Sequence, residues 1–175
     1  MWVFSKLLIN LNVEEKLAGM KARGFGFFAA NPDRHEKNFE LAKKSFLKAG
    51  IPNAEFKVVN NVKHEDMPYY LCASDVLIST SKWEGSPNII KEAMVCNCPI
   101  VSTDVGDVKW LLDGIEGCYI TSNDPNDVAD KIRKALDFKG KAKGREKLIS
   151  LGLDSEHIAK RIIKVFEVVI HNIAT

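Results

Sequence analysis

Between residues 25 and 138, short apolar runs alternate with segments in which apolar residues recur every three or four positions. The runs have the length and composition of buried strands, and the recurrence is that of helices with one apolar face. Near-continuous apolar strands separated by helices are typical of a parallel sheet that is covered on both faces. The pattern therefore predicts a doubly wound α/β domain with about five strands.

Strands and helices are predicted to alternate throughout this region. Strands are expected at residues 25–30, 55–59, 75–79, 99–102 and 118–121. Helices are expected at 39–49, 87–96, 107–112 and 125–138, and a short helical turn at 64–73. Gly50 and Pro52 end the first of these helices, and Asp124 opens the last. The basic stretch at 139–145 fits a solvated loop or helix edge better than a phosphate-binding patch.

The last segment, from Asp154 onward, predicts one amphipathic helix of about twenty residues. Its apolar positions form a single broad stripe: Ile158, Ile162, Val165, Phe166, Val169 and Ile173. A stripe this wide is expected to dock either on the domain itself or on a domain that is missing from this chain. We thus divide the chain into an N-terminal extension (1–24), an α/β domain (25–153) and a C-terminal helix (154–175).

Composition narrows the classes of function. The chain has 175 residues and a net charge of +2, which gives no reason to expect a nucleic-acid partner. No apolar run reaches the roughly 18 residues of a membrane span, and the first residues lack the features of a secretory signal. We expect a cytoplasmic protein, with a peripheral contact at the inner face of the membrane as an open alternative. The four cysteines lack the spacing of a zinc site and are expected to be reduced thiols.

The stretch KWEGSPNIIKEAM, residues 82–94, is the strongest candidate for a ligand site. It joins a predicted strand to a predicted helix, at the sheet edge where parallel α/β domains bind ligands. We expect Ser86 to be the N-cap and Pro87 the first helical residue. The amides of Asn88 and Ile89 would then face outward at the positive end of the helix dipole, an arrangement suited to a phosphate.

Two carboxylates accompany this helix start. Gly85 has no Cβ and allows a bulky anion to approach the backbone. Glu84 can face whatever is attached to the phosphate, and Glu92 lies about 7.5 Å further along the helix. That distance suits the ribose of a nucleotide diphosphate, because a carboxylate accepts two hydrogen bonds from a vicinal diol. Two solvated acids or a Mg²⁺ site would also fit the spacing.

A second stretch, NPDRHEKN, follows the first predicted strand and should face the same edge. Arg34 and Lys37 could neutralise a diphosphate as it leaves. Exposed basic residues in a turn are also commonly just solvated. Their occurrence together with Gly85-Ser86-Pro87 at a neighbouring strand end favours the diphosphate site.

The segment from Glu84 to Met94 resembles the donor-site signature of glycosyltransferase family 4, the retaining GT-B enzymes. The residues at 73–81 and 99–106 resemble the same family, and so does the Arg34-x-x-Lys37 turn. The likeness covers residues 25–138. It implies that the domain is Rossmann-like and forms the C-terminal half of a GT-B fold.

The resemblance also implies a function: transfer of a sugar from a UDP- or GDP-sugar, in polysaccharide, lipopolysaccharide or glycolipid biosynthesis. By this likeness Arg34 and Lys37 neutralise the diphosphate, and the amides from Ser86 to Ile89 cradle it. Glu92 would bind the ribose, Glu84 would contact the sugar, and residues 60–62 would lie near the base. No metal or other cofactor is expected.

Some positions depart from the family's pattern and leave the donor open. The usual arginine six residues before the lysine falls on Asn31, and the glycine after the helix is Asn97. Asp107 and Trp110 stand where a glycine and a glutamate are common. A half of a sugar-nucleotide epimerase and a non-catalytic nucleotide-sensing module remain the alternatives.

The resemblance covers only the donor-binding half of such enzymes. The acceptor domain, with the family's usual active-site histidine, has no counterpart in the first 24 residues. We expect this missing N-terminal domain to be the main partner, and the chain alone to bind nucleotide without turnover.

Overall fold

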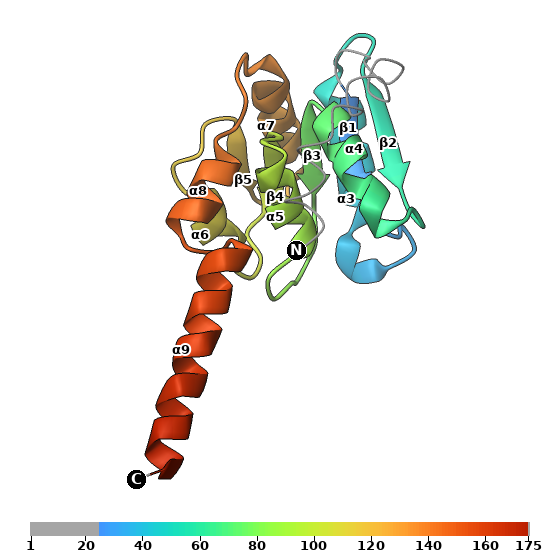
Figure 1. The fold of residues 1–175 in the computed structure, drawn as a ribbon. Helices are drawn as coiled ribbons and strands as arrows, with labels where there is room; N and C mark the ends of the chain where they lie inside the picture. Colours follow the sequence, from blue (N-terminus) through green and yellow to red (C-terminus); the bar gives the residue numbers. More distant parts are fainter. Residues whose placement is uncertain (1–24, 175) are drawn as a thin grey trace.

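The computed structural model describes residues 25–174, in which five parallel strands form one sheet of order β2–β1–β3–β4–β5 (Figure 1). The strands are β1 (Phe25–Ala29), β2 (Glu55–Val59), β3 (Val76–Ser79), β4 (Ile100–Thr103) and β5 (Cys118–Thr121). Every neighbouring pair is parallel. The predicted doubly wound α/β fold is confirmed.

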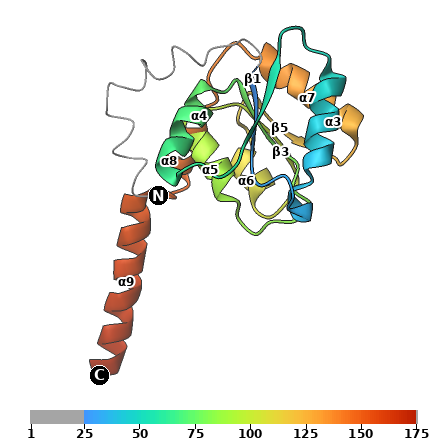
Figure 2. The same cartoon turned by 90° about the vertical axis from the view of Figure 1, so that its right-hand side faces the viewer.

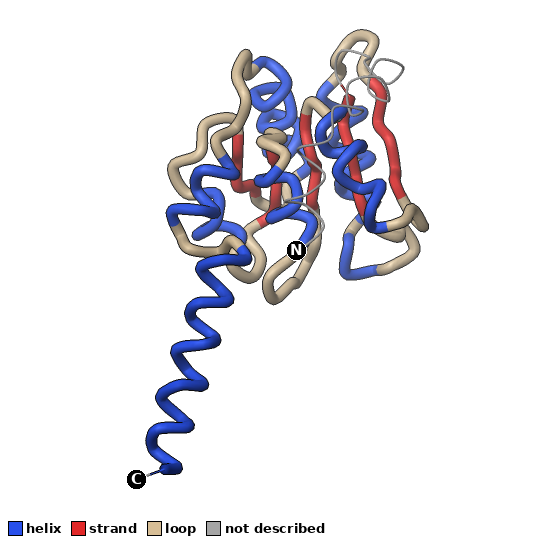
Figure 3. Tube along the Cα trace, viewed as in Figure 1, coloured by secondary structure: helices blue, strands red, loops and turns tan. Residues whose placement is uncertain are grey.

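Helices cover both faces of the sheet (Figure 2). One face carries α3 (Phe39–Ala49) and α7 (Pro125–Asp137), and the other carries α4 (Met67–Ala73), α5 (Asn88–Val95), α6 (Val108–Leu112) and α8 (Gly144–Ser150). Figure 3 shows the strands lying between these two helical layers. Two short 3₁₀ turns, η1 (His35–Lys37) and η2 (His64–Asp66), precede α3 and α4.

The core lies on both sides of the central strands. In β3, Val76 and Ile78 join the apolar cluster of α3 and α7, whereas Leu77 joins the cluster of α4, α5 and α8. Ile100 and Val101 of β4 divide in the same way. This alternation explains the continuous apolar runs, because each strand buries both of its faces.

The structure defines two predicted segments more closely. The helical segment at 64–73 is η2 followed by α4, with Pro68 in the first turn of α4. The stretch at 139–145, expected to be a loop or helix edge, contains the start of α8 at Gly144. A Cβ at Gly144 would lie 2.6 Å from the Cα of Met94, so α8 starts in close contact with α5.

The predicted C-terminal helix is confirmed as α9 (Ser155–Ala174), in which the amides of Glu156 and His157 donate to Asp154 Oδ1. It projects away from the sheet domain in both views (Figures 1 and 2), and residues 159–172 are all exposed. Of the two docking partners considered, the described part of the domain does not cover the apolar stripe. Within residues 25–174, no helix combines the length and apolarity needed to cross a membrane. The predicted extension (1–24) lies outside the described residues.

Candidate functional site

The candidate site lies where the strand order reverses, between the adjacent strands β1 and β3. The chain connects β1 to β2 on one side and then places β3, β4 and β5 on the other. At such a switch point the two following loops diverge and leave a crevice at the carboxyl ends of the strands. The two stretches singled out in the sequence are these two loops.

Hydrogen bonds join the two loops. The amide of Lys82 donates to the carbonyl of Glu36 at 2.8 Å. The buried hydroxyl of Thr80 donates to the carbonyl of Asn38 at 3.0 Å. The turn that carries Lys37 is therefore fixed against the loop that carries Glu84.

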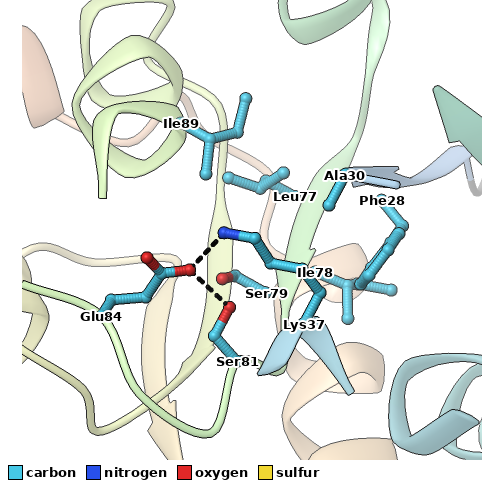
Figure 4. A pocket seen from close by; sticks show the side chains of 9 residues that line it. All are labelled: Phe28, Ala30, Lys37, Leu77, Ile78, Ser79, Ser81, Glu84 and Ile89. Carbon is cyan, nitrogen blue, oxygen red and sulfur yellow. Dashed lines mark hydrogen bonds and ion pairs between the residues drawn. The ribbon is translucent and has the colours of Figure 1, made fainter. Parts of the chain in front are cut away.

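A charged pair spans the crevice (Figure 4). Lys37 Nζ donates to Glu84 Oε1, and Ser81 Oγ donates to the same oxygen at 2.9 Å. Only about a fifth of each charged side chain is exposed (20% for Lys37, 18% for Glu84). The small pocket around the pair is lined by Phe28, Ala30, Lys37, Leu77, Ile78, Ser79, Ser81, Glu84 and Ile89. Lys37, Glu84 and Ile89, three of the residues singled out in the sequence, thus meet at one place.

The start of α5 differs from the prediction. The helix begins at Asn88 with Pro87 as N-cap, and no side chain caps it. Ser86 was expected to cap the helix, but its hydroxyl instead donates to the carboxylate of Asp107 and accepts from Lys91. The hydroxyl is turned away from the helix by these two charged partners. The amides of Asn88 and Ile89 still have no carbonyl within the helix to bond.

Gly85 and Gly106 differ in what surrounds them. A Cβ on Gly85 would meet no atom within 4 Å. A Cβ on Gly106 would lie 2.0 Å from the carbonyl oxygen of Gly85, and Gly106 has a φ of +55°. The amide of Asp107 donates to that same carbonyl at 3.2 Å. The loop before α5 therefore rests on the backbone at Gly106, whereas Gly85 faces open space.

Glu92 lies on α5 beside the turn that follows β2. Its Oε1 is 3.7 Å from His64 Nδ1, and 13% of its side chain is exposed. Burial raises the pKa of this carboxyl, and the nearby His64 opposes the shift. Glu92 is not part of the pocket lining in Figure 4.

Arg34 lies on the same turn as Lys37. The amide of Lys37 donates to the carbonyl of Arg34 at 3.0 Å, which fixes the backbone of Arg34. Its guanidinium pairs with Glu36, and 59% of the side chain is exposed. It is likewise not among the residues lining the pocket. Within residues 25–174, no group of three His, Cys, Asp or Glu side chains is placed to hold a metal ion.

A family model described as "Glycosyl transferases group 1" matches residues 29–137, which include most of the domain and every residue that lines the pocket except Phe28. The chain belongs to this family. An uncharacterized glycosyltransferase of Methanocaldococcus jannaschii is 28% identical over 109 residues, which cover 57% of this chain and 30% of the relative. The UDP-Gal:alpha-D-GlcNAc-diphosphoundecaprenol alpha-1,3-galactosyltransferase of Escherichia coli is 23% identical and covers 95% of this chain. This chain spans 48% of that relative.

Solved structures show that the domain has the GT-B type of fold. Sucrose-phosphate synthase from Thermosynechococcus elongatus superposes with a TM-score of 0.78 at 18% identity, over 93% of this chain and 49% of the synthase. WaaG, a glycosyltransferase involved in lipopolysaccharide biosynthesis, superposes with a TM-score of 0.59 at 15% identity, over 79% of this chain and 46% of WaaG. The chain thus corresponds to about half of each structure.

Sequence reasoning missed several residues that build the candidate site. Ser81 orients Glu84, Asp107 and Lys91 hold Ser86, and His64 faces Glu92. Asp107 was noted only as a departure from the family's pattern. The polar run Ser79–Ser81 at the end of a buried strand was the available signal for Ser81.

Proposed function

We propose that this chain is the half of a retaining glycosyltransferase that binds the nucleotide-diphospho-sugar donor. The observation that carries this proposal is the meeting of Lys37, Glu84 and the first turn of α5 around one pocket at the switch point (Figure 4). A cation and a helix start offer a diphosphate two kinds of positive partner. Switch points are also where open α/β sheets bind nucleotides.

In the proposed complex, the diphosphate lies between Lys37 and the amides of Asn88 and Ile89. Lys37 already has one acceptor, Glu84, and an ammonium has three donors. It can therefore bind a phosphate oxygen while it keeps Glu84 in place beside the sugar. As the bond to the sugar breaks, Lys37 stabilises the charge that develops on the leaving diphosphate. The exposed Arg34 on the same turn adds a second charge.

The ribose is proposed to lie over α5 toward Glu92. The contact with His64 places this carboxylate beside the turn after β2, next to residues 60–62. A nucleotide would thus run from the pocket across α5, with its base near the end of β2. Glu92 has lost part of its hydration through burial, and a diol would supply the hydrogen bonds that water no longer does.

The donor and the pathway are proposed from the relatives. One relative's name specifies UDP-galactose and a diphosphoundecaprenol-linked acceptor. Another is a phosphatidylinositol N-acetylglucosaminyltransferase subunit of Saccharomyces cerevisiae, 26% identical over 114 residues. We therefore propose a UDP-sugar donor, with a GDP-sugar as second choice, and glycolipid or polysaccharide synthesis as the process.

A second domain is proposed to supply the acceptor site. The chain spans 20–48% of the length of the curated relatives it matches. The exposed helix α9 extends beyond the sheet edge at which the β1–α3 and β3–α5 loops lie (Figure 1). Its apolar stripe is proposed to pack on the domain that faces this edge.

Calorimetry on the full chain with UDP, GDP and ADP tests the donor site. We expect UDP to bind with a Kd below a millimolar. Glu92→Ala should weaken binding by about 1–3 kcal/mol, the cost of losing a charged hydrogen-bond partner. If none of the three nucleotides binds below a millimolar, the donor-site proposal is wrong.

A further inference from the structure

Two cysteines, Cys72 on α4 and Cys96 at the end of α5, lie against each other. Cys96 Sγ is 3.9 Å from the carbonyl oxygen of Pro68. Within an α-helix this carbonyl accepts the amide of residue 72, and the side chain of residue 72 leans back toward it. The two sulfurs are therefore close enough for each thiol to shift the pKa of the other.

The two cysteines lie on a pair of helices that contact each other. Helices α4 and α5 both follow parallel strands and run side by side in the same direction (Figure 1). The contacts His64–Glu92 and Pro68–Cys96 repeat along the pair at an interval of one helical turn. Both cysteines are also partly exposed, so a small reagent can reach them.

The surroundings favour a thiolate at Cys72. The contact with the Cys96 side chain, together with the charges of Arg145 and Lys141, lowers the pKa of Cys72 to about 7, against the opposing effect of burial. Arg145 is fixed in place, because its Nε donates to the carbonyl of Val95 at 2.9 Å. Its amide donates to Asn97 Oδ1 at 3.0 Å. A thiolate beside a second thiol and two cations is the environment of a reactive cysteine.

The other two cysteines differ. Cys98 is buried, and burial raises its pKa far above the ordinary range. Burial likewise raises the pKa of Cys118 to about 12. At neutral pH both are protonated thiols and weak nucleophiles, so they serve as internal references for Cys72.

We propose that Cys72 and Cys96 form a redox-reactive pair that peroxide converts into a disulfide joining α4 to α5. The Cys72 thiolate attacks one oxygen of hydrogen peroxide, the O–O bond breaks, and the released hydroxide takes up a proton as water. The Cys96 sulfur then attacks the resulting sulfenic acid, its own proton leaves with the hydroxyl as a second water, and the S–S bond forms. The two cysteines lose two electrons in total, and the peroxide gains them.

The bridge would lie one helical turn from the Glu92–His64 contact. It would therefore restrict the helix pair that carries the proposed ribose contact, a consequence that rests on the proposed function. The reactivity of the pair does not depend on that function, and it can be measured without any nucleotide.

The first test uses the reduced chain at pH 7 and a limiting amount of iodoacetamide. Peptide mass spectrometry should show Cys72 alkylated at least about tenfold faster than Cys118, because a larger share of it is thiolate. Equal rates for the two cysteines would overturn the proposal.

The second test treats the same chain with hydrogen peroxide, blocks free thiols and maps the cross-linked peptides. We expect a Cys72–Cys96 bridge that dithiothreitol reverses, and the same bridge in the control variant Cys98→Ser. Cys96→Ser should instead leave a sulfenic acid on Cys72 that dimedone traps. No bridge in the unmodified chain, or a bridge through Cys98, would overturn the proposal.

Discussion

At the scale of single residues, the site depends on a cation and a carboxylate that neutralise each other across two loops. Lys37 and Glu84 are mostly shielded from water, so removing either one would leave the other charge without its partner. The pair thus holds the crevice in shape and also keeps an ammonium at the point where a diphosphate would enter. Substitutions of these two residues therefore affect stability and binding together. Substitutions of neighbouring residues distinguish an effect on stability from an effect on binding more clearly.

Substitutions of Gly85 and Gly106 are expected to separate an effect on binding from an effect on stability. Gly85→Ala should leave the free energy of unfolding nearly unchanged, because its Cβ meets no atom of the protein within 4 Å. It should weaken UDP binding, because the new methyl group would occupy the space of the phosphates. Gly106→Ala should instead destabilise the fold by at least about 1–2 kcal/mol, the cost of a left-handed backbone for a residue with a Cβ.

Thermal unfolding and calorimetry on both variants check this prediction. If Gly85→Ala binds UDP as tightly as the unchanged chain, the phosphates do not approach the backbone at Gly85. If Gly106→Ala is as stable as the unchanged chain, the described contact between the two loops is wrong.

We predict that Glu92 makes the free energy of unfolding depend on pH. Burial raises the pKa of its carboxyl above the ordinary 4.5. As pH rises, the unfolded chain therefore releases this proton before the folded chain does, so Glu92 lowers the free energy of unfolding progressively above about pH 4.5. Glu92→Gln should then be more stable than the unchanged chain at pH 7, and this gain should disappear at lower pH. UDP binding should nevertheless weaken by about 1–3 kcal/mol.

Chemical denaturation between pH 4 and pH 8, with calorimetry at pH 7, measures both effects. Glu65→Gln is the control, because Glu65 is an exposed acid on the turn beside His64 and should change neither quantity. A Glu92→Gln variant with unchanged affinity would return Glu92 to a purely structural role.

At the scale of helices and strands, hydrophobic periodicity predicted most of the fold. The strands at 55–59 and 118–121 and the helix at 39–49 have the predicted bounds, because their apolar positions and flanking turn residues agree. Helix α8 was not predicted. It contacts α5 through Gly144, and a glycine adds no apolar side chain to the pattern by which the other helices were recognised.

The candidate site was predictable where chemistry and local spacing coincide. Lys37, Glu84 and Ile89 come from two loops whose meeting follows from the strand order. The position of Ser86 was not predictable, because its partner Asp107 lies 21 residues away on a third loop. Tertiary contacts of this kind override local capping preferences.

Helix α9 carries a prediction at this scale. Truncation after Arg161 removes the exposed, largely apolar part of the helix and keeps the contact between Arg161 and Leu151. The melting temperature should change by less than about 2 °C, since the removed side chains do not pack on the described domain. The shortened chain should also self-associate less. A fall in melting temperature of more than about 5 °C would show that α9 stabilises this domain.

A second prediction at this scale concerns the contact between α8 and α5. Gly144→Ala would place a methyl group 2.6 Å from the Cα of Met94, and backbone cannot yield as a flexible side chain does. The free energy of unfolding should fall by about 1–3 kcal/mol. Lys143→Ala, at the exposed neighbouring position, is the matched control and should have little effect. Equal stability of the two variants would contradict the described packing.

At the scale of the whole molecule, residues 25–174 form one compact sheet domain with a long helix that leaves it (Figure 1). The domain belongs to the group 1 glycosyl transferase family and has a crevice at its switch point. It corresponds to about half of each of the two similar structures. This organisation agrees with the proposal that this domain binds the donor and that a second domain presents the acceptor. The claim on which the rest depends is that a diphosphate binds at the start of α5.

Amide chemical shifts of the ¹⁵N-labelled chain test that claim most directly, with UDP and uridine added in parallel. We predict that UDP shifts the amides of Gly85, Asn88 and Ile89, and that uridine at the same concentration leaves them unchanged because it carries no phosphate. UDP binding that leaves these three amides unmoved, or uridine shifting them equally, would contradict the account.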